Sequence, residues 1–247
     1  MNSPDYTFVT TCKGRLHHLR QTLPSLLETH CAGIVVVDYA CPDGTANWVE
    51  QHYPKVTVVR VTDDAGFCLA RARNIGANAV KSSWIAFIDA DVSVHDGWDA
   101  WLQNHLRPAT MYRAGAVNSK VDQETYGTFI CEKTAFDRVG GYDESFTGWG
   151  GEDVDLYRRL TTALVAQQTY PGALVTAISH GDDERTRFAA IKDTRMHQLI
   201  GELYMRAKSF YAGFLDYGRV LPLEERKKLM AFIVKRVQAW DSAGRPV

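Results

Sequence analysis

Short, almost wholly apolar segments alternate with amphipathic segments in the N-terminal part of the chain. The apolar segments are rich in β-branched and aromatic residues, which favour β-strands. They predict strands over Tyr6–Thr11, Ile34–Val37, Val56–Val61 and Trp84–Ile88. The last of these ends abruptly in Asp89.

The amphipathic segments between these strands carry apolar residues at helical spacing. They predict helices over about 16–30, 45–52 and 71–80. Strands that alternate with helices form parallel sheets, and such sheets bind ligands beyond the carboxyl ends of their strands. Because the polar clusters 10–15, 38–45 and 89–91 each follow a predicted strand, we expect an enzyme.

The remainder of the chain has two different patterns. Residues from about 111 to 171 are less regular and rich in glycine, and we expect them to form the second half of the site. Helical patterns then run through about Phe188–Tyr217 and, past Pro222, about Leu223–Trp240. The chain as a whole is predicted to be an α/β protein with a mostly parallel central sheet flanked by helices and a helical C-terminal extension.

Composition narrows the class of protein. With 247 residues and 45% hydrophobic content, the chain can bury a full core. A formal charge of −1 argues against general nucleic-acid binding. No basic N-terminal segment, cleavable apolar stretch or membrane-spanning run is found, so we expect a soluble, cytoplasmic protein.

The five cysteines lack the paired spacing of a zinc site or of a small disulfide scaffold. We interpret most of them as buried apolar residues in a reducing compartment. They are Cys12, Cys31, Cys41, Cys68 and Cys131.

Asp89 and Asp91 form an Asp-x-Asp pair directly after a predicted strand. Alternate residues of an extended segment share a face, so both carboxylates point to the same side. Magnesium and manganese prefer such oxygen ligands and keep positions for phosphate oxygens. A metal site is therefore favoured over an ordinary charged loop.

Asp38 ends the apolar run Ile34–Val37, where its carboxylate could accept hydrogen bonds from a nucleobase or a ribose. Its neighbour Asp43, followed by glycine and threonine, is typical of a turn before a helix. We interpret Asp38 as a ligand-binding residue and Asp43 as a turn residue.

Arginines near these acids have two interpretations. Arg71 and Arg73 lie on a predicted helix, and Lys13 and Arg15 follow the first strand. Each could pair with a diphosphate or with a metal-site carboxylate, or could lie on a solvated surface. We include Arg73 among the residues expected to bind the cosubstrate.

The run Gly148–Asp155 places an indole, Trp149, and the adjacent carboxylates Glu152 and Asp153 beside a glycine turn. Small residues let the backbone approach a ligand, and a carboxylate there can accept a proton from a bound hydroxyl. Alternatively, the acids occupy the first turn of a helix, where they interact well with the helix dipole.

His180 follows the apolar segment Ala173–Ile178 and precedes two aspartates. A lone histidine is more often structural than a ligand. A neutral imidazole beside a carboxylate-held manganese would nevertheless be a suitable additional ligand.

These motifs together resemble glycosyltransferase family 2, an inverting family with the GT-A fold. The resemblance rests on the segments Val9–Arg15, Val36–Asp38, Asp43–Thr45, Ala72–Gly76 and Phe87–Asp91. The Gly148–Asp155 run resembles the acceptor motif of β-1,4-galactosyltransferases, polypeptide N-acetylgalactosaminyltransferases and the chondroitin polymerase. Together the motifs cover residues from about 7 to 180.

The resemblance implies a role for each matching residue. It implies Asp153 as the catalytic base and a site for Mn²⁺ or Mg²⁺ at Asp91 and His180. The nucleotide would contact Thr11, Arg15 and Asp38, with the ribose at Asp89. The sugars would be bordered by Trp149 and Gly151, with the acceptor held by Glu152. Where the family often has paired acids at the second strand, this chain has Asp38 and Tyr39, which leaves the identity of the donor's nucleobase open.

The resemblance also implies the domain organisation and the reaction. A GT-A domain would span 1–185, with a nucleotide-sugar-binding half over 1–110 and an acceptor half over 111–185, followed by a helical extension over 186–247. The enzyme would move a hexose or N-acetylhexosamine from a nucleotide donor, most simply a UDP-sugar, to an acceptor hydroxyl by direct displacement with inversion.

Two other functions remain open. A sugar nucleotidyltransferase uses a related sheet, but the first strand lacks the glycine-rich phosphate loop that such chemistry needs. A noncatalytic carbohydrate-binding relative is disfavoured by the acidic positions. The basic C-terminal helix is expected to pack on the domain or to form a homo-oligomer, ahead of peripheral membrane contact.

Overall fold

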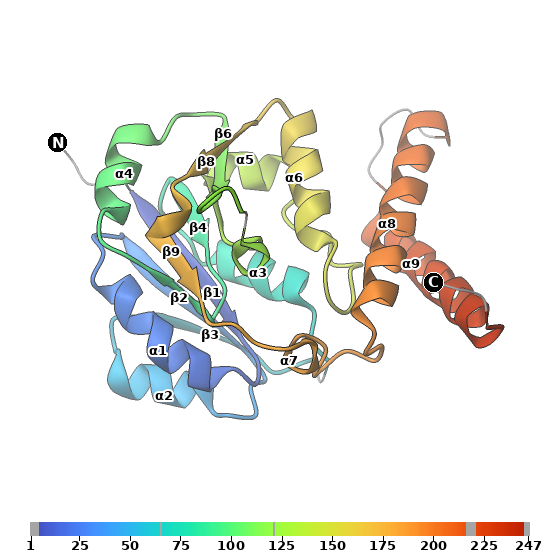
Figure 1. The fold of residues 1–247 in the computed structure, drawn as a ribbon, viewed down its shortest axis with the longest axis horizontal. Helices are drawn as coiled ribbons and strands as arrows, with labels where there is room; N and C mark the ends of the chain where they lie inside the picture. The colour runs from blue at the N-terminus through green and yellow to red at the C-terminus, as the bar shows by residue number, and fades with distance from the viewer. Residues whose placement is uncertain (1–4, 65, 121, 216–220, 245–247) are drawn as a thin grey trace. The chain divides into compact units, whose positions relative to one another are not determined.

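A seven-stranded sheet forms the centre of the protein, with the strand order β3-β2-β1-β4-β7-β6-β8 (Figure 1). The structure, a computed structural model, describes residues 5–64, 66–120, 122–215 and 221–244. The strands of this sheet are β1 (Tyr6–Cys12), β2 (Gly33–Tyr39), β3 (Thr57–Val61), β4 (Trp84–Phe87), β6 (Thr110–Ala114), β7 (Phe129–Glu132) and β8 (Ala166–Tyr170).

The sheet is mostly parallel. Strands β3, β2, β1 and β4 run parallel to one another, and so do β6 and β8, whereas β7 is antiparallel to both of its neighbours. The register pairs Cys12 with Asp38 and Val9 with Phe87. The carboxyl ends of β1, β2 and β4 therefore meet at one edge of the sheet.

Helices cover both faces of this sheet because its central strands β1, β2, β4 and β7 are apolar on both sides. On one face, α1 (Leu16–Leu27), α2 (Thr45–His52) and α4 (Trp98–His105) contribute to one buried core with Phe8 and Val36. On the other face lie α3 (Leu69–Asn78) and α5 (Lys133–Arg138). There Gly76 approaches Val9, and the ring of Phe136 lies 5.1 Å from that of Phe87. This arrangement confirms the predicted α/β architecture.

The remaining elements are short strands and helices of the second half of the chain. Strands β5 and β9 form a separate two-stranded antiparallel sheet. The elements are β5 (Val92–Val94), α6 (Glu152–Thr162), β9 (Val175–Ala177), α7 (Asp182–Arg185), α8 (Thr194–Phe210) and α9 (Leu223–Ser242), with short helical turns at Gln123–Thr125, Gly172–Leu174 and Tyr211–Leu215.

The chain divides into two compact units, which are described separately below. The sheet unit comprises Met1–Ala65, Ala72–Gly141 and Tyr157–Ser179. The helical unit comprises Gly66–Arg71, Tyr142–Leu156 and His180–Val247.

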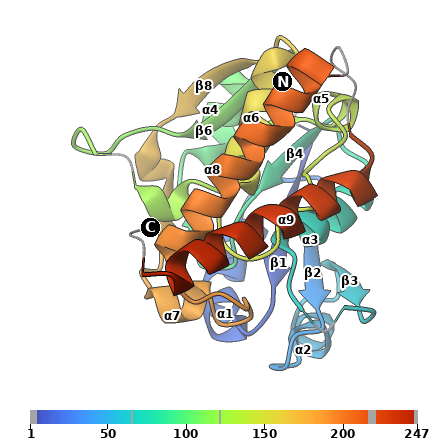
Figure 2. The ribbon, with the colours of Figure 1, turned by 90° about the vertical axis from the view of Figure 1, so that its right-hand side faces the viewer.

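The helical unit has its own apolar core between α8 and α9, which lie side by side (Figure 2). Side chains of Ile200 and Tyr204 on α8 pack with Met230 and Ile233 on α9. Phe146, from the loop before α6, completes this core. The helical C-terminal end predicted from the sequence is confirmed.

Two predicted helices differ from the structure by three residues or more at one end. The first stops at Leu27 rather than His30, because the hydroxyl and N–H of Thr29 both donate to the Leu26 carbonyl. The helix expected from Phe188 begins at Thr194, where the Asp193 carboxylate accepts the Arg195 N–H and caps the first turn. Its predicted end, Tyr217, lies outside the described residues.

The stretch 111–171, expected to be irregular, contains regular elements. It includes most of β6, all of β7 and α5, and also α6 and β8. Strand β8 pairs only with β6 at the edge of the sheet, and four of its five residues are exposed. An edge strand needs no apolar alternation, so the pattern of residues did not identify it.

Among the described residues, no helix combines the length and apolar character that crossing a bilayer requires.

We predict that Gly76→Ala lowers the free energy of unfolding by about 1 kcal/mol or more, measured by urea denaturation. A Cβ at position 76 would lie 2.5 Å from Val9 Cγ1 and 2.9 Å from Val37 Cγ2. Overpacking of this kind costs about 1–3 kcal/mol, which outweighs the roughly 1 kcal/mol that alanine gains over glycine in a helix. Asn78→Ala, at an exposed position of the same helix, is the control and should not destabilise the protein. A stabilised Gly76→Ala variant would contradict the close packing of α3.

Candidate functional site

Asp91 is held at the carboxyl end of β4 by an arginine from the end of β1. Arg15 Nη1 lies 2.8 Å from Asp91 Oδ2, and the Asp91 side chain is only 5% exposed. The Asp91 carbonyl accepts the N–H of Ile178 just beyond β9. Both backbone and carboxylate of Asp91 are therefore fixed within the sheet unit.

Asp89 is held in the same way by a second arginine. Arg73 Nη2 lies 2.6 Å from Asp89 Oδ1, and the Arg73 side chain is 3% exposed. The sequence left open whether Arg73 pairs with a charged group or lies on a solvated surface. In the structure Arg73 is buried and pairs with a carboxylate of the Asp-x-Asp pair. Each of the two aspartates thus lies beside one guanidinium group. Removal of one partner from such a partly buried ion pair destabilises the fold.

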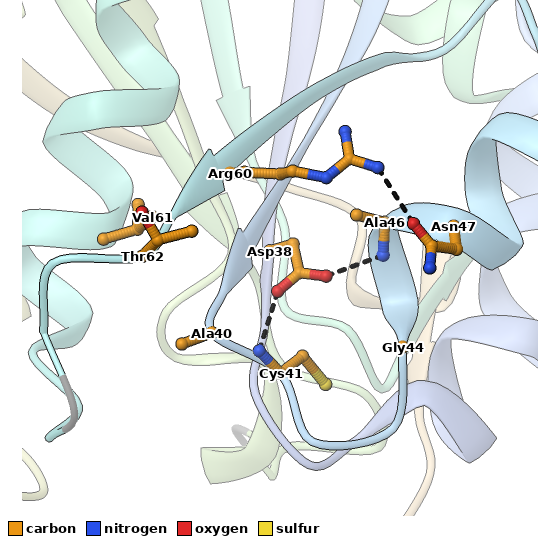
Figure 3. Close-up of a pocket in the computed structure, with 9 residues that line it drawn as sticks. All are labelled: Asp38, Ala40, Cys41, Gly44, Ala46, Asn47, Arg60, Val61 and Thr62. Atoms are coloured by element: carbon orange, nitrogen blue, oxygen red, sulfur yellow. Dashed lines mark hydrogen bonds between the residues drawn. The ribbon is translucent and has the colours of Figure 1, made fainter.

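Asp38 organises the loop between β2 and α2 (Figure 3). Its two carboxylate oxygens accept the N–H of Cys41 at 2.7 Å and the N–H of Ala46 at 2.6 Å. The loop turns through Gly44, which has a φ of +73° that suits glycine. Asp43 accepts a hydrogen bond from the Leu16 N–H, as suits its interpretation as a turn residue.

A pocket of about 220 Å³ opens beside this loop. It is smaller than the pockets that hold drug-sized ligands. Arg60 of β3 lies at the pocket and donates to Asn47, and it also pairs with Glu50. The lining residues are Asp38, Ala40, Cys41, Gly44, Ala46, Asn47, Arg60, Val61 and Thr62.

Two residues after the first strand also have defined surroundings. Thr11 is buried near the end of β1, opposite Val37 of β2. The ammonium group of Lys13 lies 5.6 Å from the centre of the Tyr39 ring, and the Tyr39 hydroxyl donates to Asp64 at 2.5 Å. Lys13 is 7% exposed, which excludes the interpretation of a solvated lysine.

In the helical unit, the glycines of the Gly148–Asp155 run have conformations that favour glycine. Gly148, Gly150 and Gly151 have φ values of +108°, +82° and +96°. A Cβ at Gly151 would also lie 2.8 Å from the Phe146 ring. Trp149 between them is half-buried, with the guanidinium of Arg185 5.8 Å from its ring centre. The glycines thus allow a turn that other residues would strain.

Asp153 and Glu152 begin α6, and both are buried. The Tyr142 hydroxyl donates to Asp153 Oδ1 at 3.0 Å, which orients this carboxylate. The acids occupy the first turn of α6, as the helix-dipole interpretation expects, and they directly follow the glycine turn. Sequence reasoning missed Tyr142, because it lies in a loop outside any helix or strand, where no periodicity relates it to Asp153.

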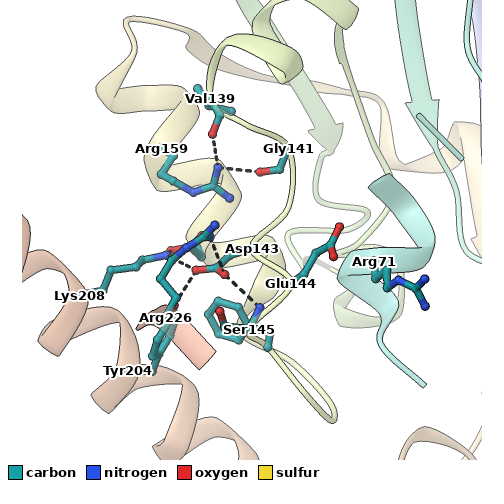
Figure 4. Close-up of polar contacts among 12 residues, drawn as sticks. Arg71, Val139, Gly141, Asp143, Glu144, Ser145, Arg159, Tyr204, Lys208 and Arg226 are labelled. Atoms are coloured by element: carbon teal, nitrogen blue, oxygen red, sulfur yellow. Dashed lines mark hydrogen bonds and ion pairs between the residues drawn. The ribbon is translucent and has the colours of Figure 1, made fainter. Parts of the chain in front are cut away.

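Asp143, next to Tyr142, is the centre of a buried charge cluster (Figure 4). Its side chain is fully buried and pairs with Lys208 Nζ at 2.8 Å and Arg226 Nη1 at 2.7 Å. The Tyr204 hydroxyl also donates to it at 2.7 Å. Lys208 pairs in addition with Asp155 of α6. Through these ion pairs, Lys208 of α8 and Arg226 of α9 both contact the loop that precedes the glycine turn.

The pKa of Asp143 reflects two opposing effects. Burial by itself would raise the pKa, but the charges of Lys208 and Arg226 and the hydrogen bonds from Lys208 and Tyr204 hold the pKa well below its usual range. Asp143 is therefore a carboxylate throughout the physiological pH range.

His180 opens the last segment of the helical unit. It is half-buried, and its Nδ1 lies 3.3 Å from the Gly181 carbonyl. It follows Ile178 by two residues along the chain.

The predicted site residues thus form separate local groups. The sheet unit brings Arg15 to Asp91 and Arg73 to Asp89. The helical unit brings Trp149 beside Arg185 and places Glu152 next to Asp153.

Comparisons with known proteins identify glycosyltransferases. A sequence profile described as the N-terminal domain of galactosyltransferase matches residues 111–181, which include the glycine turn and His180. The pre-mycofactocin glycosyltransferase of Mycobacterium tuberculosis is 27% identical over 243 residues, covering 85% of this chain and 46% of that protein. The chain spans about half the length of this relative.

Solved structures of GT-A enzymes share the fold. The mannosyltransferase PcManGT from Pyrobaculum calidifontis, in complex with GDP-Man and Mn²⁺, has a TM-score of 0.60 at 16% identity, covering 98% of this chain and 75% of that one. GalNAc-T7 with UDP, GalNAc and Mn²⁺ has a TM-score of 0.62 at 16% identity, covering 99% of this chain and 58% of that one.

We predict that Asp143→Asn lowers the free energy of unfolding at pH 7 by about 3–5 kcal/mol, because it removes the buried carboxylate that pairs with both Lys208 and Arg226. A carboxylate with a depressed pKa stabilises the fold above its ordinary pKa of about 4, and this contribution is lost as the pH falls below that value. The difference between wild type and variant should therefore shrink between pH 5 and pH 2 in urea denaturation. Glu224→Gln, which breaks an exposed pair on α9, should change stability by less than about 1 kcal/mol. A difference independent of pH would contradict the charged state of Asp143.

Proposed function

Because the chain has the GT-A fold and is related in sequence to glycosyltransferases, we propose that it transfers a sugar from a nucleotide donor to an acceptor hydroxyl with inversion of configuration. The observation that carries this proposal is the Asp-x-Asp pair at the carboxyl end of β4, with each carboxylate held by an arginine. A UDP-linked hexose or N-acetylhexosamine is the proposed donor.

The donor is proposed to lie along the carboxyl ends of β1, β2 and β4. A nucleobase suits the pocket beside Asp38, whose volume is about 220 Å³. Thr11 and Arg15, near the end of β1, are the proposed contacts of the nucleotide. Asp89 is the proposed contact of the ribose. Asp38 would act chiefly by shaping this pocket, since its carboxylate holds two backbone amides of the loop.

The donor set fits a divalent cation. Asp91 supplies a hard carboxylate oxygen and His180 an imidazole nitrogen, a combination that suits Mn²⁺ and less readily Mg²⁺. That these two residues share one ion is proposed from the resemblance of their motifs to glycosyltransferase family 2. When bound, such an ion offsets the negative charge that develops on a departing diphosphate.

The protein's own groups would carry the remaining chemistry. Arg15 and Arg73 are cationic groups placed to bind a diphosphate once a metal ion shares the charge of their aspartates. Asp153 is the proposed base that takes the proton of the acceptor hydroxyl as the new bond forms. Tyr142 would orient this carboxylate through its hydrogen bond. Glu152, Trp149 and Gly151 would border the acceptor and the sugar.

A donor screen tests the proposed reaction. With Mn²⁺ and a series of nucleotide sugars, we expect release of free nucleoside diphosphate from one donor, and loss of that release with a chelator or in Asp91→Ala. Asp96→Ala, an exposed carboxylate nearby, is the matched control and should retain activity. Release of pyrophosphate would indicate a nucleotidyltransferase instead. Sugar binding with no release from any donor would indicate a noncatalytic relative.

A second prediction concerns the base. Asp153→Asn should bind the donor normally but transfer sugar about 100-fold to 10,000-fold more slowly, the usual contribution of a positioned base. The measurement is the rate of transfer beside donor affinity by calorimetry. Asp137→Asn makes the same chemical change on the exposed side of α5 and should leave the rate unchanged. Near-normal transfer by Asp153→Asn would exclude Asp153 as the base.

A further inference from the structure

Two cysteines that are 29 residues apart in the sequence meet beside the pocket of the sheet unit. Cys12 is the last residue of β1, and Cys41 lies in the loop after β2. Thr45 Oγ1 lies 3.2 Å from Cys12 Sγ and 3.1 Å from Cys41 Sγ, so both sulfurs contact the same hydroxyl group. The parallel pairing of β1 with β2, which sets Cys12 opposite Asp38, produces this proximity.

The surroundings of Cys41 favour a thiolate. Its sulfur accepts the Gly14 N–H at 3.1 Å and the Thr45 hydroxyl at 3.1 Å. The hydrogen bond from Cys12, together with those of Thr45, Gly14 and Asp43, lowers the pKa of Cys41 to about 5 against the opposing effect of burial. Thiolates are the nucleophilic form of cysteine.

Cys12 has the opposite character. Its side chain is 1% exposed, and the hydrogen bond to Cys41 together with burial raises its pKa well above the ordinary value. Cys12 therefore stays a thiol while Cys41 is a thiolate. This combination of an accessible thiolate and a buried partner thiol is typical of cysteine pairs that react with oxidants.

Cys41 is also accessible. It is half-buried and lines the pocket, where Figure 3 shows its side chain next to the loop that Asp38 holds. Its backbone N–H is one of the two amides bound by Asp38. A change at Cys41 therefore acts directly on the loop that shapes the pocket.

We propose that Cys41 and Cys12 are a peroxide-sensitive thiol pair whose disulfide distorts the pocket and weakens nucleotide binding. The effect on nucleotide rests on the proposed function, whereas the oxidation itself does not.

The oxidation takes place in two balanced steps. The Cys41 thiolate attacks one oxygen of hydrogen peroxide, the O–O bond breaks, and a sulfenic acid and hydroxide form. The Cys12 sulfur then attacks the Cys41 sulfur, the S–O bond breaks, and the proton of Cys12 leaves with the departing hydroxide as water. One peroxide is reduced for each disulfide formed.

Disulfide formation would pull the sulfurs to covalent distance, about 2 Å. The Cys41 sulfur would then no longer be a thiolate that accepts hydrogen bonds from the Gly14 N–H and the Thr45 hydroxyl. The loop from Ala40 to Gly44 would shift toward β1. Because Asp38 depends on this loop for its amide partners, the pocket would change shape.

The first experiment measures reactivity and linkage in the wild-type protein. At pH 6, iodoacetamide should alkylate Cys41 about tenfold faster than Cys31, because the larger thiolate fraction outweighs the lower nucleophilicity of a low-pKa thiolate. Cys31 is the matched control, since it is also half-buried but burial raises its pKa. After one equivalent of hydrogen peroxide, peptide mass spectrometry should find Cys12 linked to Cys41. Equal alkylation of the two cysteines, or the absence of this linkage, would overturn the proposal.

The second experiment measures the consequence. Calorimetry with UDP and Mn²⁺ should give at least a tenfold weaker affinity for the oxidised protein, and dithiothreitol should restore it. In Cys12→Ser, oxidation should stop at a sulfenic acid on Cys41, which dimedone traps. An oxidised protein that binds UDP as tightly as the reduced one would overturn the effect on the pocket. A reduced protein that binds no nucleotide at all would instead contradict the proposed function, while the peptide linkage would still decide whether the thiol pair is redox-active.

Discussion

The parallel pairing of β1 with β2 and β4 is the constraint on which the rest of the sheet unit depends. This pairing puts the carboxyl ends of three strands at one edge, although their residues are far apart in sequence. Arg15 can therefore reach Asp91, and Cys12 and Cys41 can contact the same Thr45 hydroxyl. Parallel strands need long connections, and the helices that supply them also cover both faces of the sheet.

Two buried carboxylates of the protein are neutralised by cationic side chains. The buried acids Asp91 and Asp143 each pair with cationic side chains, because burial of an isolated carboxylate is costly. The two clusters differ in what they can do. Asp143 is fully buried, pairs with two cations and suits a structural role, whereas Asp91 lies beyond the end of a strand, pairs with Arg15 and is the proposed metal ligand.

The glycine turn combines an acidic helix start with an unusual backbone conformation. Glu152 and Asp153 form the acidic first turn of α6, as helix stability favours. The same turn follows three glycines with positive φ, which let the backbone take a conformation unavailable to most residues. The position of Asp153 then depends on Tyr142, which comes from the loop that Asp143 anchors. Local sequence creates the motif, and tertiary contacts orient it.

The sequence by itself determined the α/β class, the order of the N-terminal strands and helices, and the positions of acids at strand ends, because these follow from local periodicity. Only the tertiary structure decided which charges pair, that Tyr142 contacts Asp153, and that Cys12 and Cys41 share a contact with Thr45. The edge strand β8 and the antiparallel β7 also came from the structure alone. Such features depend on contacts between residues distant along the chain, and a single sequence carries no periodic signal for those contacts.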